Sequence, residues 1–165
     1  MNNTHKHTIS MLVNNKPGVL VRIAHVFARR GFNIDSLVVS PTTDENFSSM
    51  TIACSGDPAT LDQIVKQVIK LVDVVHAREH NPLESLSREL ALFKVQFSPD
   101  QRTEILQIVE HFKGFTIDFT MDSMVIQGTG NSEKLDSLEK LLTNYKLIEM
   151  IRTGKIVITR GDQTT

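Results

Sequence analysis

Hydrophobic and polar residues alternate over residues 8–13, which predicts a strand with Ile9, Met11 and Val13 on one face. The next segment changes to a period of three to four residues, which predicts a helix whose apolar stripe is Leu20, Ile23, Ala24 and Phe27. Alternation returns over 33–41 and 47–55 and predicts two strands joined by a turn. A second helical period over 57–72 is followed by a strand at 74–80. Its predicted buried stripe is Leu61, Ile64, Val65, Val68 and Val72.

The second half of the chain repeats this order of elements. A strand over 88–97 is followed by a helix that starts with Ser98 as the predicted N-cap. Two strands, a helix from residue 132 and one or two final strands complete the repeat. The chain is therefore predicted to be α+β, with two ferredoxin-like βαββαβ domains that each carry two helices on one face of a sheet. We expect domains over 8–82 and 88–161, with 83–87 as a linker.

Composition and charge narrow the class of protein. The 165 residues are 40% hydrophobic and 22% charged, with a formal net charge of −1, so no strong overall field attracts nucleic acid or an anionic membrane. No apolar run approaches the ~20 residues of a membrane span. The one cysteine, Cys54, has no intramolecular disulfide partner and is interpreted as a small core residue on a strand. The sequence predicts a cytoplasmic protein with neither nucleic acid nor membrane as a partner.

Catalytic and metal-binding patterns are weak. No serine, histidine and aspartate stand in a recognisable nucleophile motif. His76 and His80 lie about 13 Å apart on an extended strand at ~3.3 Å per residue, and Glu79 points to the other face. These three are interpreted as surface residues, and His5 and His7 as at most a weak metal clip. We therefore expect no catalytic residue and no metal site.

Two other motifs have ordinary structural explanations. Residues 128–134, "GTGNSEK", lack the complete phosphate-loop pattern and predict a strand-to-helix turn capped by Asn131 or Ser132. Arg22, Arg29 and Arg30 form a basic helix face without interleaved aromatic residues. This face is either solvated or a contact for a protein partner, and not an RNA surface.

The segment "NNKPGVLVRIAHVFARRGFNI", residues 14–34, carries the strongest candidate for a binding site. Pro17 suits a first helical turn, and Gly31 suits a left-handed cap at the end of the helix. Gly18 has no Cβ, so an anion has access to the N–H groups of Gly18, Val19 and Leu20 at the positive end of the helix.

The polar residues that flank this helix fit the same site. Asn15 offers an acceptor for an ammonium group, and Asn33 begins the next strand, where it could meet a ligand held between two subunits. The alternative remains open that Gly18 is a turn residue, Asn15 a helix cap and Asn33 a turn former.

This segment, the later "MTI" and "LDQIVKQVIKLVDVV", the "RELALFKV" of the second half and the terminal "TRGD" resemble the regulatory (small) subunits of acetolactate synthase, also called acetohydroxyacid synthase. The resemblance covers nearly the whole chain. It implies an N-terminal ACT domain, which is a βαββαβ module that binds amino acids, and a C-terminal domain of related topology. It also implies a homodimer formed through the ACT domains, with the effector at their interface.

The resemblance further implies a regulatory chain without an active site. A separate large subunit would use thiamine diphosphate, Mg²⁺ and FAD to form 2-acetolactate or 2-aceto-2-hydroxybutanoate, and this chain would hold no cofactor. The small subunit would activate that enzyme and make it sensitive to valine or another branched-chain amino acid. The family's valine-response positions correspond to Asn15, Gly18, Asn33 and Ile34, with Gln63 on the second helix as an addition.

The chain departs from the family's pattern in a few places. Ser49 replaces a common arginine, and Ser40 stands close to the expected pocket where a small apolar residue or glycine is usual. Two other classes of function remain as alternatives. The chain could be a free-standing ACT module that controls a transporter or a transcription factor, or an enzyme in its own right.

Overall fold

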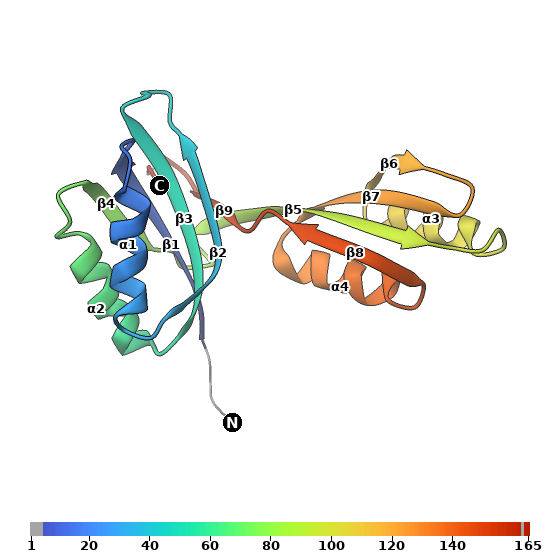
Figure 1. Cartoon of the computed structure of the whole chain (residues 1–165), viewed down its shortest axis with the longest axis horizontal. Coiled ribbons are helices and arrows are strands. Elements are labelled where there is room, and N and C mark those ends of the chain that lie inside the picture. The colour runs from blue at the N-terminus through green and yellow to red at the C-terminus, as the bar shows by residue number, and fades with distance from the viewer. Residues whose placement is uncertain (1–4, 163) are drawn as a thin grey trace. The chain divides into compact units, whose positions relative to one another are not determined.

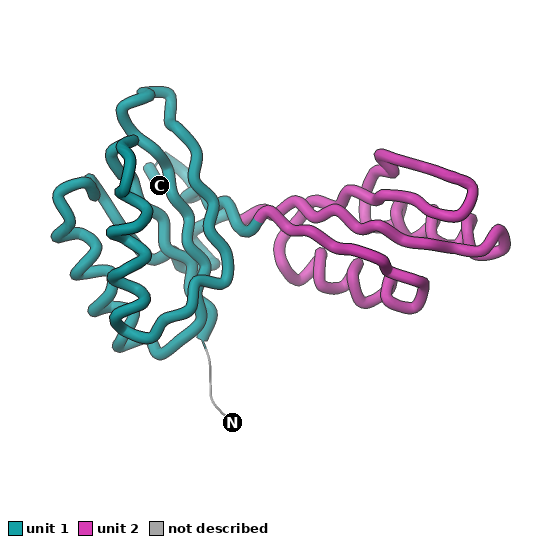
Figure 2. The backbone as a smooth tube through the Cα atoms, viewed as in Figure 1, with its two compact units in different colours: residues 1–86, 154–165 teal, residues 87–153 magenta. Residues whose placement is uncertain are grey.

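A computed structural model describes residues 5–162 and 164–165 of the chain (Figure 1). The elements form two compact units (Figure 2). Unit 1 contains the chain up to Leu86 together with Gly154–Thr165, and unit 2 contains Ser87–Thr153. No helix among the described residues has the length and apolar character needed to cross a bilayer.

Unit 1 has the predicted βαββαβ order. Its elements are β1 (His5–Asn14), α1 (Val19–Ala28), β2 (Asn33–Pro41), β3 (Phe47–Gly56), α2 (Pro58–Val68) and β4 (Val74–Glu79). The four strands form an antiparallel sheet in the order β2-β3-β1-β4, so β2 and β4 lie at its edges. Both helices pack on the same face of this sheet, as Figure 1 shows.

The core of unit 1 follows the alternation read from the sequence. The strands contribute Ile9, Met11, Val13, Met50, Ile52 and Cys54, and the helices contribute Val19, Ile23, Phe27, Leu61, Ile64 and Val68. The predicted burial is wrong for two residues of the helical stripes. Leu20 is 41% exposed because Val19 takes the core position at the start of α1, and Val72 is 92% exposed because α2 ends at Val68.

Unit 2 repeats the architecture. Its elements are β5 (Ser85–Gln96), α3 (Arg102–His111), β6 (Phe115–Phe119), β7 (Ser123–Gly130), α4 (Ser132–Leu142) and β8 (Lys146–Arg152), followed by β9 (Ile156–Thr159). The sheet order is β6-β7-β5-β8, and β9 also pairs with β5. Helix α3 begins at Arg102 rather than beside Ser98, because a turn precedes it. The two-domain α+β prediction is confirmed.

The compact units differ from the expected domain limits in two places. The predicted linker 83–87 is partly strand, since β5 begins at Ser85 and continues without interruption into unit 2. The last residues of the expected C-terminal domain 88–161 group with unit 1, because the chain from Gly154 onward packs against the first sheet.

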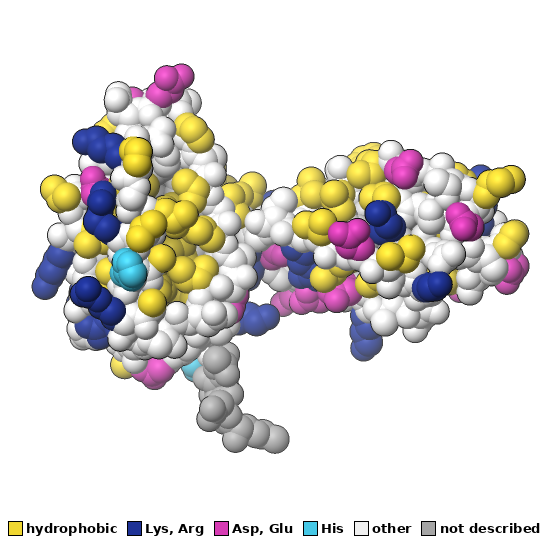
Figure 3. Space-filling model, viewed as in Figure 1, with side chains coloured by type: hydrophobic (Ala, Val, Ile, Leu, Met, Phe, Trp, Pro, Cys, Tyr) yellow, Lys and Arg dark blue, Asp and Glu magenta, His cyan; other side chains and the backbone are white. Residues whose placement is uncertain are grey.

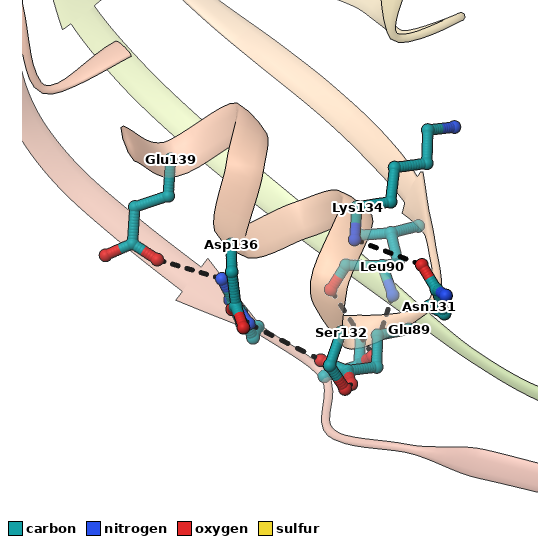
Figure 4. Close-up of polar contacts among 9 residues, drawn as sticks. Glu89, Leu90, Asn131, Ser132, Lys134, Asp136 and Glu139 are labelled. Carbon is teal, nitrogen blue, oxygen red and sulfur yellow. Dashed lines mark hydrogen bonds and ion pairs between the residues drawn. The ribbon is translucent and has the colours of Figure 1, made fainter. Parts of the chain in front are cut away.

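A buried carboxylate and an arginine join β5, β8 and α4 within unit 2 (Figure 4). Glu89 is 7% exposed and accepts a hydrogen bond from the Ser132 hydroxyl. Arg152 lies 3.8 Å from Glu89 and also pairs with Asp136 at 2.7 Å and Glu139 at 2.8 Å. The arginine therefore compensates a carboxylate that is almost out of contact with water.

We expect Arg152→Gln to lower the free energy of unfolding of unit 2 by about 3 kcal/mol, because it leaves the buried Glu89 charge unpaired. Lys94→Gln is the control, since it removes the same charge from a pair in which both side chains are about half exposed. We expect that change to cost less than about 1 kcal/mol. Urea unfolding at neutral pH measures both variants, and equal losses would contradict the compensating role of Arg152.

Candidate functional site

Helix α1 begins in an unusual backbone conformation. Gly18 is the N-cap with φ 83° and ψ −9°, in the left-handed region, and Val19 is the first helical residue. Pro17 therefore lies in the turn before the helix and not in its first turn, where the sequence pattern predicted it. A left-handed N-cap favours glycine independently of any ligand. The backbone conformation therefore explains glycine at position 18, in addition to the access that it gives an anion to the helix N–H groups.

The positive end of α1 has no acidic residue in its own first turn and no capping side chain among the described residues. The Val19 N–H donates to the Lys16 carbonyl at 3.4 Å, and the Val19 side chain is buried in the core. Leu20 lies half exposed beside this end. The end of the helix thus has the electrostatic character that attracts an anion.

Arg22 is a member of this site that the sequence pattern assigned to a solvent or partner face. A Cβ placed on Gly18 would lie 3.2 Å from Nη1 of Arg22, so the guanidinium lies directly beside the glycine. Its Nη2 donates to Oδ2 of Asp73 at 2.5 Å, and Asp73 is 7% exposed. The spacing of four residues from Gly18 was the signal that could have placed Arg22 here.

Asn15 is fixed next to the turn between β2 and β3. Its backbone N–H donates to the Asn46 carbonyl at 2.8 Å, and its side-chain Nδ2 donates to the Glu45 carbonyl at 3.0 Å. Asn15 does not cap α1, because Gly18 holds that position. The side chain is exposed, and this orientation makes Nδ2 the atom that faces the turn.

Asn33 and Ile34 begin β2. The Asn33 Nδ2 donates to Oδ1 of Asp35 at 3.3 Å, and Oδ2 of Asp35 accepts from the Ser55 hydroxyl at 2.5 Å. Ile34 is half-buried against the core and pairs with Cys54 of β3. A β-bulge follows directly, since the register shifts between Ile34 and Ser36 and leaves Asp35 unpaired.

The structure does not bring the predicted site residues together within one chain. Gly18 starts α1 and Asn33 follows its end, so a helix of 10 residues, about 15 Å long, separates them. Asn15 bonds to Asn46, whereas Asn33 pairs with Ser55 at the far end of β3. At ~3.3 Å per residue these two asparagines lie about 30 Å apart. Gln63 is exposed on α2, and no described contact joins it to either group.

Two surface features adjoin both groups of residues. Strand β2 is an edge of the sheet, which leaves one side of its backbone without a strand partner among the described residues. Leu20, Val21 and Val39 are exposed on α1 and β2, by 41%, 57% and 44%. Hydrophobic side chains gather beside helix α1 on the face of unit 1 seen in Figure 3. An edge strand next to exposed apolar residues is typical of a surface that a second chain covers.

Of the three residues predicted at the surface near β4, His76 and Glu79 are exposed, and His80 is buried. His7 is 7% exposed within β1, and its Nδ1 lies 2.6 Å from Oε1 of Glu79. His80 is also 7% exposed, and its Nε2 lies 2.5 Å from the Ser10 hydroxyl. Burial lowers the pKa of His80, with the nearby charge of Arg78 acting in the same direction. The described residues contain no group of three or more side chains that could hold a metal ion.

Cys54 lies in the core on β3, next to Ile34. Burial raises the pKa of its thiol from the ordinary 9.0 to about 11, with the negative charges of Asp35 and Glu79 adding to the effect. The thiol is therefore neutral at physiological pH and behaves as an apolar core group, as predicted.

We expect the raised pKa of Cys54 to lower the stability of unit 1 as the pH increases from 9 to 11. In this range the unfolded chain loses the thiol proton and the folded chain keeps it, so the free energy of unfolding falls by about 2 kcal/mol. Urea unfolding at several pH values measures the loss. Cys54→Ala is the control, and an equally steep loss in that variant would contradict the assignment.

Comparisons with known proteins match both halves of the chain. A family model described as "AHAS small subunit-like ACT domain" matches residues 9–76, and one described as "Small subunit of acetolactate synthase" matches residues 88–161. The probable acetolactate synthase small subunit of Archaeoglobus fulgidus is 40% identical over 158 residues, which are 96% of this chain and 99% of that protein.

Further relatives agree. The acetolactate synthase small subunit of Mycolicibacterium smegmatis is 41% identical over 160 residues, which are 97% of this chain and 94% of that protein. The crystal structure of the small subunit from Thermotoga maritima matches with a TM-score of 0.87 and 40% identity, over 96% of this chain and 99% of that one. The likeness therefore extends through both units and includes the segment with Gly18 and Asn33.

Proposed function

The chain belongs to the family of acetolactate synthase small subunits, and from this membership we propose that it is a non-catalytic regulatory subunit, which activates the large subunit and makes it sensitive to feedback by valine. The family and its ACT domain support this role. In the proposal, the catalytic partner supplies thiamine diphosphate, Mg²⁺ and FAD, and this chain supplies the effector site. From the same family membership we also propose a cytoplasmic location.

The observation that carries the proposal is the separation of the site into two groups at opposite ends of α1 and β2. A small amino acid cannot contact both groups in one chain. If two β2 edges pair in an antiparallel way about Leu37, Asn33 of the partner subunit lies opposite Pro41, near the turn that holds Asn15. We therefore propose a homodimer through the ACT domains, with an effector site at each end of the interface.

Each part of valine has a complementary group in this arrangement. The carboxylate would accept hydrogen bonds at the start of α1 from the Gly18 and Leu20 amides and from the guanidinium of Arg22. The ammonium group would donate to the side-chain oxygen of Asn15. The isopropyl group would pack beside Ile34 of the partner subunit.

The size of these interactions suits a metabolite sensor. Burial of a Val-sized side chain contributes about 1.5–3 kcal/mol, and a helix N-terminus adds about 0.3–1 kcal/mol for the charge. A charge-assisted hydrogen bond from Arg22 adds about 1.5–3 kcal/mol, so the three terms total about 3–7 kcal/mol, and a millimolar Kd corresponds to about 4 kcal/mol.

Inhibition requires more than binding. Valine must bind one conformation of the small-subunit dimer better than another, and the two conformations must act differently on the large subunit. A coupling free energy of about 1–3 kcal/mol is sufficient for useful control.

We expect Gly18→Asp to abolish valine inhibition of the reconstituted enzyme and to preserve activation of the large subunit. The new carboxylate would lie beside Arg22, where the carboxylate of valine is proposed to bind. Gly161→Asp is the control, since Gly161 also has a positive φ, 72°, and its Cβ would meet nothing within 4 Å. Assays of pyruvate consumption against valine concentration measure both. Full valine sensitivity in the Gly18→Asp enzyme would contradict the proposed carboxylate site.

We expect Arg22→Gln to raise the Kd for valine about tenfold or more, because a hydrogen bond to a charged group contributes about 1.5–3 kcal/mol. Arg88→Gln removes the same charge from an exposed position in unit 2 and should leave the Kd unchanged. Isothermal titration calorimetry with valine compares the two variants. Equal affinities would exclude Arg22 from the effector site.

A further inference from the structure

The chain that leaves unit 2 returns to unit 1 and packs against its sheet. The backbone of Gly154 lies against Ser36 and Val38 of β2. Further along, the Arg160 N–H donates to the Glu84 carbonyl at 2.9 Å. We name Gly154–Thr165 the C-terminal segment.

The C-terminal segment covers the face of the sheet that the helices leave open. Side chains alternate between the two faces of a strand, so Ser10, Thr51 and Ala53 point away from α1 and α2. These three are nevertheless only 3%, 6% and 9% exposed. Burial on the side away from the helices shows that this face is packed, and Ser36 and Val38 lie on it, paired with Ala53 and Thr51.

The contact between Gly154 and Ser36 leaves no room for a side chain. A Cβ on Gly154 would lie 2.8 Å from Cβ and 3.0 Å from Oγ of Ser36, and 3.4 Å from Cγ2 of Val38. The φ of Gly154 is +85°, which also favours glycine. Any side chain at this position must therefore displace either the C-terminal segment or β2.

Strand β2 joins this contact to the proposed effector site. Asn33 and Ile34 lie on one side of the bulge at Asp35, and Ser36 lies directly on the other side. Hydrogen bonds from Asn33 and Ser55 hold the Asp35 carboxylate. Only Ile34 and Asp35 separate Asn33 from Ser36, so a shift of Asn33 is passed to Ser36 over a short length of chain.

We infer that the contact of Gly154 with Ser36 is the point at which occupation of the effector site is transmitted to unit 2. The inference rests on the proposed valine site. It concerns the coupling of that site to inhibition of the enzyme, and not the affinity of the site for valine. Gly154 directly follows Thr153, whose backbone N–H donates to the Leu90 carbonyl at 3.0 Å in the sheet of unit 2. Displacement of Ser36 therefore acts on a residue bonded covalently to the last residue of unit 2.

Gly154→Ala tests the inference in the reconstituted enzyme of full-length chain and catalytic subunit. We expect the Kd for valine to stay close to that of the wild type, and the concentration of valine for half inhibition to rise by about tenfold or more. Gly161→Ala is the matched control. Gly161 lies in the same segment with a φ of +72°, but a Cβ there would meet nothing within 4 Å. That variant carries a comparable backbone strain without the contact and should keep normal inhibition.

Two further variants separate the contact from a folding defect. Ser36→Val enlarges the other side of the contact without changing a glycine, and it should weaken inhibition in the same way. Ser36→Gly added to Gly154→Ala removes Cβ and Oγ, the two atoms closest to the new methyl group, and it should restore inhibition. Circular dichroism and gel filtration establish that each variant is folded.

The outcomes distinguish the inference from the proposed function. Binding of valine with lost inhibition in Gly154→Ala and Ser36→Val, together with rescue by the double variant, supports the inference. Normal inhibition in both single variants overturns it, as does an equal loss in Gly161→Ala. If the wild-type chain neither binds valine nor confers inhibition, the proposed function itself fails, whatever the variants do.

Discussion

Strand β2 forms backbone pairs on one side only among the described residues, and the regulatory role proposed for this chain depends on that edge. An unpaired edge exposes a row of N–H and C=O groups that a second copy can satisfy. The same strand begins with Asn33 and Ile34, bulges at Asp35 and meets Gly154 through Ser36. One strand thus connects the proposed dimer surface, half of the proposed effector site and the return of the chain from unit 2.

The other half of the proposed effector site depends on local electrostatics. The left-handed Gly18 starts α1 without an acidic or capping side chain, and Arg22 lies beside it instead. Asp73, which is almost buried, fixes the guanidinium and takes up part of its hydrogen-bonding capacity. A helix end and an oriented arginine provide a preorganised anion site, in which little conformational freedom is lost when a ligand binds.

The two units share an architecture but differ in the contacts that stabilise them outside the common βαββαβ core. Both sheets are bulged at equivalent edge strands, at Asp35 in β2 and at Ile117 in β6. Unit 2 contains the buried Glu89 with Arg152, whereas unit 1 is covered on its second face by the C-terminal segment. The repeat of βαββαβ order therefore does not imply that each half folds from a continuous stretch of sequence.

The order and type of the elements, and most of the core, follow from local patterns in the sequence. Alternation and helical period are local properties, so the spacing of Ile9, Met11, Ile23 and Phe27 is enough to assign them to buried faces. Pairing and packing between distant residues were decided only in the tertiary structure. The guanidinium of Arg22 turns to Gly18 because Asp73, 51 residues later, fixes it. Asn15 and Asn33 are close in the sequence but lie at opposite ends of the sheet because helix α1 runs between them. Only a residue without a side chain fits against Ser36 at the position of Gly154. The local sequence around Gly154 does not predict this contact, because Ser36 is distant in the chain.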